Sequence, residues 1–196
     1  MRDTLKDHAD RHRWNRKYRE ILTPSWMPSA LFSALPHDAL PAGDALELAC
    51  GASGTALELA RRGRRVTAAD ISDAALALLA DRAREEGLGE RIRTLLADLT
   101  CWRPARQDFA LVICSAYWNS GVFRQAARAV MPAGFIAWEA FSLAHLNYRP
   151  DFPRAYCMAA GEPERLLPPG FTPVLTEELD TGTRVTRRLI ARRTEA

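Results

Sequence analysis

The stretch ALELACGASGTALELARRG, residues 45–63, decides the fold of this chain. Residues 45–49 are mostly apolar and predict a strand, and residues 55–62 predict a helix that Gly63 closes. Small residues fill the turn between the two elements. A strand, a tight turn and a helix in this order are the layout of a nucleotide-binding turn.

The glycines of this turn do not have the spacing of a dinucleotide-binding fingerprint. That fingerprint places three glycines at fixed positions, where this chain has Ala49, Gly51 and Ser53, with Gly54 one residue later. Either the motif is absent, or the turn belongs to a different cofactor.

Strands and helices alternate after this stretch, which predicts a parallel sheet with helices on both faces. Further strands are expected at 65–70, 91–98, 108–117, 135–141, 171–179 and 183–193, and further helices at 9–22, 27–35, 72–86, 120–131 and 162–167. The DTGT segment between the last two strands is a hairpin signal. We therefore expect an α/β fold with a doubly wound, mostly parallel, seven-stranded Rossmann-like sheet and an antiparallel C-terminal strand.

The N-terminal helix, expected over 9–22, has one apolar stripe. Trp14, Tyr18, Ile21 and Leu22 recur at helical spacing, and Pro24 ends the helix. The stripe predicts that this face packs on the rest of the protein.

Composition and charge exclude several classes of protein. Hydrophobic residues make up 47% and charged residues 26% of the chain, as in an ordinary globular domain. No apolar run approaches the ~18 residues of a membrane span, and the charged N-terminus is unlike a signal peptide. The four cysteines form no CxxC pair, so we expect reduced thiols and a cytoplasmic protein. The four histidines show no metal spacing, and no metal site is expected.

Basic residues are concentrated at the N-terminus. Residues 1–20 contain seven: Arg2, Lys6, Arg11, Arg13, Arg16, Lys17 and Arg19. Such a patch can meet RNA, but a run of charges is usually a solvated face, and the net charge of +3 is too small to imply a polyanionic partner. We do not expect a nucleic-acid partner.

Acidic residues end two of the predicted strands. Ligands of open α/β sheets bind at the carboxyl ends of the strands. Asp70, 23 residues after Glu47, can accept hydrogen bonds from both ribose hydroxyls of a nucleoside, and Asp98 can accept one from an exocyclic amine such as that of adenine. The turn, Asp70 and Asp98 together suit an adenosine ligand that needs no pyrophosphate cradle.

With these spacings, ELACGASGTALELARRGRRVTAADIS, LLADLT and DFALVICSAY resemble the class I S-adenosylmethionine (SAM) methyltransferases. The similarity is greatest to the small tellurite-resistance and thiopurine-type enzymes, whose first motif reads [DE]-L-[GA]-C-G, and it covers about residues 10–141. The departure is Ser53, where the family usually has a third glycine. Ser53 either replaces that glycine, or its hydroxyl donates a hydrogen bond to the methionine carboxylate.

The resemblance implies a role for each matching residue. Glu47 orders the turn near the methionine amino group, Ala49 and Gly51 line the methionine and ribose, and Ser53 completes the turn. Asp70 accepts from the ribose hydroxyls and Ile71 packs on adenine. Asp98 and Leu99 address the adenine edge, and Cys114 lies under the methionine portion.

The N-terminal segment HRWNRKYREIL resembles the lid helix of these enzymes, which carries W-x-x-x-[WY]. Trp14 and Tyr18 are one turn apart, and an aromatic face stabilises a cation such as a sulfonium by roughly 0.5–2 kcal/mol. On the acceptor side we expect five residues that contact substrate: Tyr117, Trp118, His145, Tyr148 and Arg149.

The function expected from this resemblance is SAM-dependent methyl transfer to a small-molecule S, N or chalcogen nucleophile, with S-adenosylhomocysteine (SAH) as product. The [DN]-P-P-[YF] motif of many nucleobase and amide methyltransferases is absent after the fourth strand, and no strong general base is visible. One alternative is methyl transfer to RNA or protein through the basic N-terminus. A remote alternative is a nicotinamide-dependent Rossmann oxidoreductase.

We expect one methyltransferase domain over 1–196, as a monomer or homodimer. Its parts are a helical lid (1–40), a SAM-binding core (41–141), a substrate loop (142–170) and a C-terminal hairpin (171–196).

Overall fold

The strand and helix around the small-residue turn are β1 (Ala45–Leu48) and α3 (Gly54–Arg61) in the computed structural model, which describes residues 5–194. Ser53 caps α3, since its hydroxyl accepts a hydrogen bond from the Ala56 amide at 2.9 Å. The turn between strand and helix is therefore formed as the sequence predicted.

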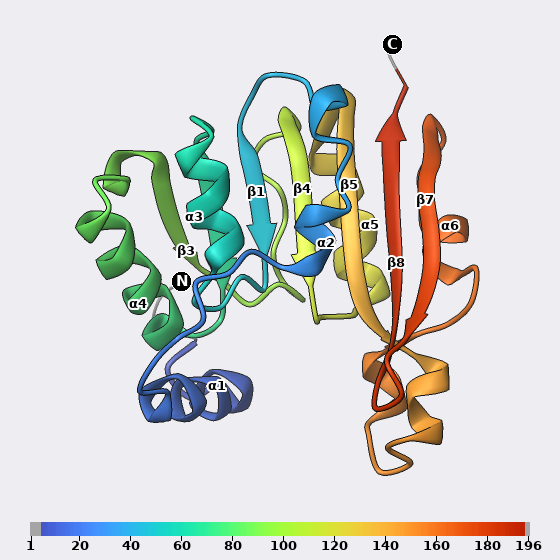
Figure 1. Cartoon of the computed structure of the whole chain (residues 1–196), viewed down its shortest axis with the longest axis horizontal. Coiled ribbons are helices and arrows are strands. Elements are labelled where there is room, and N and C mark those ends of the chain that lie inside the picture. The colour runs from blue at the N-terminus through green and yellow to red at the C-terminus, as the bar shows by residue number, and fades with distance from the viewer. Residues whose placement is uncertain (1–4, 195–196) are drawn as a thin grey trace.

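The described chain forms one sheet with the strand order β3-β2-β1-β4-β5-β8-β7 (Figure 1). Its other strands are β2 (Val66–Asp70), β3 (Ile92–Leu96), β4 (Phe109–Ser115), β5 (Val130–Ser142), β6 (Cys157–Met158), β7 (Phe171–Asp180) and β8 (Val185–Arg193). The pairs among β1 to β5 are parallel, while β8 is antiparallel to β5 and β7. The expected mostly parallel sheet with an antiparallel last strand is confirmed, and the two-residue β6 is an addition beside β5.

Helices cover both faces of the sheet, as a doubly wound fold requires. One face packs on α2 (Ala30–Ser33), α3 and α4 (Asp73–Glu85), and the other on α5 (Ser120–Ala129) and α6 (Glu162–Leu166). The central strands β1 and β4 are almost entirely buried between these layers. Short 3-10 helices are η2 (His37–Ala39), η3 (Gly89–Arg91), η4 (Leu143–Asn147) and η5 (Arg154–Tyr156).

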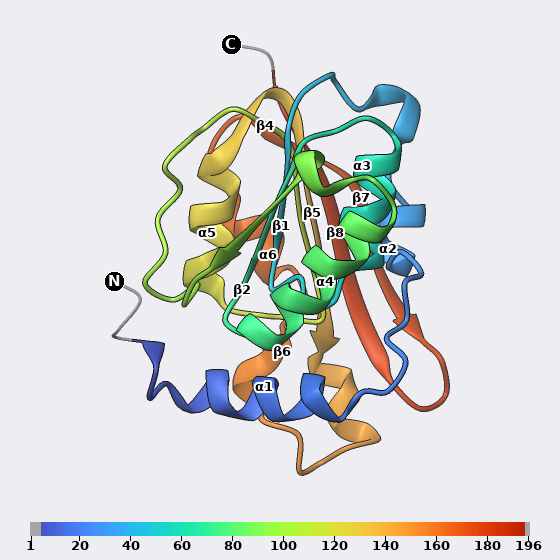
Figure 2. The same cartoon turned by 90° about the vertical axis from the view of Figure 1, so that its left-hand side faces the viewer.

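The first helix, α1 (Ala9–Glu20), runs across the edge of the sheet at which the parallel strands end (Figures 1 and 2). The prediction of an apolar stripe that continues to Leu22 is wrong. The helix ends at Glu20, and the side chain of Leu22 is 96% exposed.

Polar contacts with the start of α4 hold α1 in place. Asn15, which is buried, donates to the Asp73 carboxylate at 2.7 Å, and its own carbonyl oxygen accepts from the Ser72 hydroxyl at 2.7 Å. Arg11 donates to the same carboxylate at 2.8 Å, which lowers the pKa of Asp73 to about 2. Because these polar contacts attach α1 to α4, the aromatic residues of α1 are not needed for that attachment.

Gly54 is explained by packing rather than by a ligand. The backbone of Trp26 and Met27 passes over the start of α3 so closely that a Cβ at residue 54 would lie 2.4 Å from its atoms. The Ser29 amide, just after this crossing, donates to the Thr55 hydroxyl at 2.9 Å. Gly54, which does not fit the expected glycine spacing, therefore allows the Trp26–Met27 backbone to pack closely against α3.

Other element bounds differ from the sequence prediction for local reasons. The helix expected at 27–35 is shortened to Ala30–Ser33, because Pro28 precedes the capping residue Ser29. The fifth strand begins at Val130, which pairs with Phe109 before a bulge shifts the register. Among the helices of the described chain, none combines the length and apolar character needed to span a membrane.

Candidate active site

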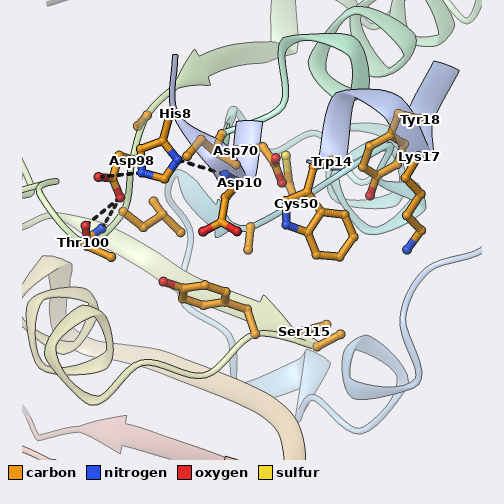
Figure 3. A pocket seen from close by; sticks show the side chains of 16 residues that line it. His8, Asp10, Trp14, Lys17, Tyr18, Cys50, Asp70, Asp98, Thr100 and Ser115 are labelled. Carbon is orange, nitrogen blue, oxygen red and sulfur yellow. Dashed lines mark hydrogen bonds and ion pairs between the residues drawn. The ribbon is translucent and has the colours of Figure 1, made fainter. Parts of the chain in front are cut away.

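A cavity of about 380 Å³ lies beneath α1, at the carboxyl ends of the parallel strands (Figure 3). Each wall comes from a different element: α1, the turn after β1, the end of β2, the segment after β3 and the end of β4. Its lining residues are His8, Asp10, Trp14, Lys17, Tyr18, Ala49, Cys50, Asp70, Ile71, Ala97, Asp98, Leu99, Thr100, Ser115, Ala116 and Tyr117.

Half of the residues singled out in the sequence line this cavity. They are Trp14, Tyr18, Ala49, Asp70, Ile71, Asp98, Leu99 and Tyr117. The strand ends bring these positions together from distant parts of the chain, as expected for a parallel sheet.

Asp70 ends β2 at the floor of the cavity. Its carboxylate accepts from the Gly51 amide and from the Ser72 amide, each at 2.8 Å. Burial raises its pKa, and hydrogen bonding by the backbone amides of Ser72, Gly51 and Ile71 opposes that rise. A carboxylate has about four lone-pair sites, so Asp70 retains capacity for two ligand hydroxyls.

Asp98, after β3, has a different environment. Its Oδ1 accepts from the Thr100 amide at 2.9 Å and from the Thr100 hydroxyl at 2.7 Å. The His8 Nε2 atom is 3.7 Å from its Oδ2. Partial burial favours the neutral acid, but the hydrogen bonds from Thr100, together with Cys101 and His8, outweigh it, and the pKa of Asp98 is lowered. A charged acceptor thus faces the cavity beside Leu99.

Two alanines that line the cavity adopt positive φ angles. Ala49 after β1 has φ 49° and Ala116 after β4 has φ 61°. Non-glycine residues rarely adopt this conformation, and such strain is concentrated at functional sites. Both strand ends turn sharply to open the cavity.

Tyr18 covers the glycine turn. A Cβ at Gly51, whose φ is +59°, would lie 2.1 Å from the Tyr18 hydroxyl oxygen. Burial, and then the charge of Asp70, raise the pKa of Tyr18 to about 12, so the phenol stays protonated and can donate a hydrogen bond. Gly51 itself is therefore under the tyrosine rather than in the cavity lining.

Trp14 lies one turn before Tyr18, with ring centroids 6.4 Å apart. Its ring makes cation–π contacts with two neighbouring side chains. The Lys17 ammonium is 4.6 Å and the Arg13 guanidinium carbon is 5.1 Å from the ring centroid. The ring can thus receive a cation in this position.

Glu47 and Ser53 form a buried pair behind the turn, outside the cavity lining. The Ser53 hydroxyl oxygen is 2.8 and 2.7 Å from the two carboxylate oxygens of Glu47. Because a hydroxyl has one proton, Ser53 either shares that proton between the two oxygens or accepts a hydrogen bond from a protonated Glu47. Burial raises the pKa of Glu47 to about 8, consistent with that proton. The Ser53 hydroxyl is engaged by Glu47 and by α3.

The remaining predicted residues do not line the cavity. Cys114 is fully buried in β4, where burial raises the pKa of its thiol. Trp118 packs in the core against Phe123 and Trp138, with ring centroids 5.6 and 6.4 Å away.

The three loop residues expected to contact substrate also have partners elsewhere. His145 is 5% exposed and stacks on Phe141 at 4.3 Å. The Tyr148 hydroxyl donates to Asp180, and Arg149 pairs with Asp151.

The sequence reasoning missed Asp10 and His8. Asp10, Trp14, Lys17 and Tyr18 are spaced i, i+4, i+7 and i+8 and line the same cavity. This mixed polar and aromatic stripe indicates which side of the helix faces the cavity. A search for apolar residues alone does not find it. Within residues 5–194, no group of three or more potential metal ligands is found.

Comparison with known proteins agrees with this architecture. Residues 45–134 match the family model described as a methyltransferase domain. The search among curated proteins finds no match.

Many solved structures share the fold at low sequence identity. Magnesium protoporphyrin IX methyltransferase from Synechocystis PCC 6803 with bound SAH is 19% identical, with a TM-score of 0.70 over 98% of this chain and 97% of that one. Geranyl diphosphate C-methyltransferase from Streptomyces coelicolor A3(2) is 13% identical, with a TM-score of 0.71 over 96% and 99% of the two chains.

The same fold also occurs in a protein with other chemistry. The [4+2]-cyclase SpnF is 16% identical, with a TM-score of 0.67 over 85% of this chain and 80% of that one. The described chain thus shares its Rossmann-like fold with methyltransferases of known structure, and its residues 45–134 match a methyltransferase domain model.

Proposed function

We propose that this chain transfers a methyl group from SAM to a small-molecule S, N or chalcogen nucleophile by in-line displacement. The observation that carries the proposal is the cavity under α1, where Asp70 and Asp98 end neighbouring strands and face one space with Trp14 and Tyr18. Its volume of about 380 Å³ lies in the range of small-ligand sites.

The residues present fit SAM. Asp70 has free acceptor capacity for the ribose hydroxyls, and Asp98 with Leu99 offers an acceptor and a backbone for the adenine edge. Ile71 is placed to pack on the base. Trp14 and Tyr18 offer aromatic faces to the sulfonium, and Lys17 is the cation of the lining that can meet the methionine carboxylate.

SAM supplies an activated methyl group on its positive sulfur. The protein's own task is to align the nucleophile and to keep water away, which can supply ~7–11 kcal/mol in favourable intramolecular cases. α1 is the element that covers the bound cofactor and keeps water away, because Asn15 and Arg11 fix it to α4 above the cavity.

The placement of the basic N-terminal residues favours a small acceptor over RNA. Of those residues, Lys17 lines the cavity, whereas four line a separate hollow beside α1 and α4: Lys6, Arg11, Arg16 and Arg19. Arg2 lies outside the described residues. A polyanion such as RNA that bound in that hollow would therefore lie outside the cavity in which we place SAM.

Transfer can be measured with SAM that carries a labelled methyl group. We expect label to pass to at least one member of a panel of thiols, selenols, tellurite, imidazoles and amines, with SAH formed in equal amount. Asp70→Ala is the control that should remove the transfer. SAM binding without transfer to any acceptor, RNA included, would indicate a binding protein instead of a transferase.

A further inference from the structure

Asp10 is the one carboxylate of the cavity lining to which the proposed binding of SAM assigns no contact. It lies in the first turn of α1 and is partly buried. Figure 3 shows its carboxylate between His8 and Trp14, directed into the cavity. Once Asp70 has met the ribose and Asp98 the adenine edge, Asp10 is the acid that remains in the lining.

The Asp10 carboxylate has no hydrogen bond or ion pair with any residue in the described range 5–194, although its backbone amide donates to His8 Nδ1 at 3.2 Å. Since that nitrogen accepts, the proton of the His8 ring is on Nε2, which is 3.7 Å from Asp98. The N–H group of the His8 ring therefore lies on the side of Asp98 and not on the side of the Asp10 carboxylate. Lys17 lies over the Trp14 ring. Within the described residues, neither His8 nor Lys17 forms an ion pair with the Asp10 carboxylate.

An aromatic side chain, Tyr117, shares the cavity lining with Asp10. Tyr117 lines the same cavity from the end of β4, and its pKa is raised by burial first and then by negative charges that include Asp98 and Asp10. Its phenol stays protonated and acts as a hydrogen-bond donor, not as a base. Asp10, at a helix start where the dipole favours negative charge, is the anionic group on this side.

We propose that Asp10 binds the methyl acceptor directly, and that the acceptor is a nitrogen base, an imidazole or an amine. An unpaired carboxylate that shares a cavity with an aromatic ring suits a nitrogen that becomes positively charged as it is methylated. It would repel a thiolate, a selenolate or a tellurium oxyanion. The inference rests on the proposed function and narrows its acceptor from three classes to one.

The chemistry balances without another reactant. The acceptor reacts as its neutral base, so an ammonium group first loses its proton to water. The nitrogen lone pair then forms the new N–C bond, the methyl–sulfur bond breaks, and its electron pair stays on sulfur to give neutral SAH. Positive charge passes from sulfur to nitrogen, where the Asp10 carboxylate stabilises it in the transition state. The carboxylate then accepts the N–H proton of the methylated product and releases it to water.

The test compares Asp10→Asn with Asp7→Asn. Both variants remove one negative charge from the same segment, but Asp7 is exposed and does not line the cavity. SAH affinity is measured first and should change less than threefold in both. Imidazole and benzylamine are then titrated into each protein–SAH complex. We expect Asp10→Asn to weaken their binding at least fivefold, and Asp7→Asn to match the unmodified protein.

Transfer of labelled methyl gives the second readout. Label should pass to imidazole or benzylamine faster than to a thiol or tellurite, and Asp10→Asn should lower kcat/KM for the nitrogen probes at least tenfold. The inference is overturned if the unmodified complex binds no nitrogen probe, if thiol or tellurite is preferred, or if Asp10→Asn leaves binding and transfer unchanged. Failure of SAH to bind any of the three proteins would instead overturn the proposed function.

Discussion

Asp70→Ala is expected to weaken SAH binding about 100-fold. The side chain would lose two charge-assisted hydrogen bonds to the ribose, each worth about 1.5 kcal/mol or more, and about 3 kcal/mol corresponds to roughly two orders of magnitude in Kd. Isothermal titration calorimetry with SAH measures the change directly.

Two further proteins separate ribose binding from structural damage. Asp81→Ala removes an exposed acid on α4 outside the cavity lining and should bind SAH as the unmodified protein does. Gly51 donates to Oδ2 of Asp70 and Ser72 donates to Oδ1, so Asp70→Asn keeps an acceptor for only one of the two amides and should lie between the two alanine variants. An affinity of Asp70→Ala within twofold of the unmodified protein would show that Asp70 only shapes the turn.

The free protein is expected to lose stability as the pH rises from about 4.5 to about 8, because of Glu47. Burial raises the folded-state pKa of this carboxyl from 4.5 to about 8. In that window the folded protein keeps a proton that the unfolded chain has released. The contribution is therefore fully present below about pH 4.5 and is lost by about pH 8, at about 1.4 kcal/mol per pH unit.

Urea unfolding at pH 5, 6, 7 and 8 tests this, with Glu47→Gln as the comparison. Glutamine keeps a donor and an acceptor for Ser53 but does not titrate. The difference in unfolding free energy between the two proteins should change steadily over this range in favour of the variant. A constant difference would mean that Glu47 is ionised in the folded state throughout.

Most of the sheet was predictable because its strands are buried on both faces. In β1 and β4 this burial produces short, nearly continuous apolar runs, and the chemistry-bearing residues follow where the runs end. The sequence alone therefore assigns Asp70 and Asp98 to one edge of the sheet, and both line the cavity.

The attachment of α1 could not be predicted in the same way. Its contacts are made by Asn15 and Arg11 with Ser72 and Asp73, residues nearly 60 positions away and polar on both sides. Periodicity analysis weights apolar residues, so it assigned Leu22 to the packed face and missed Asp10.

Long-range packing also decides the residues of the turn. Gly54 is required by the Trp26–Met27 backbone, and the Ser53 hydroxyl is engaged by Glu47, although the sequence offered both positions as parts of a ligand loop. His145 and Tyr148 follow β5 as substrate residues should, but the loop folds back and gives them partners in Phe141 and Asp180. Such loop paths depend on tertiary contacts that carry no periodic signal.

The central claim is that the cavity under α1 binds a nucleoside with an amino-acid tail and not a dinucleotide. Calorimetric titration of the protein with SAH and, separately, with NADH tests it most directly. We expect saturable binding of one SAH per chain and no binding of NADH. Absence of SAH binding, or NADH binding at comparable affinity, would contradict it.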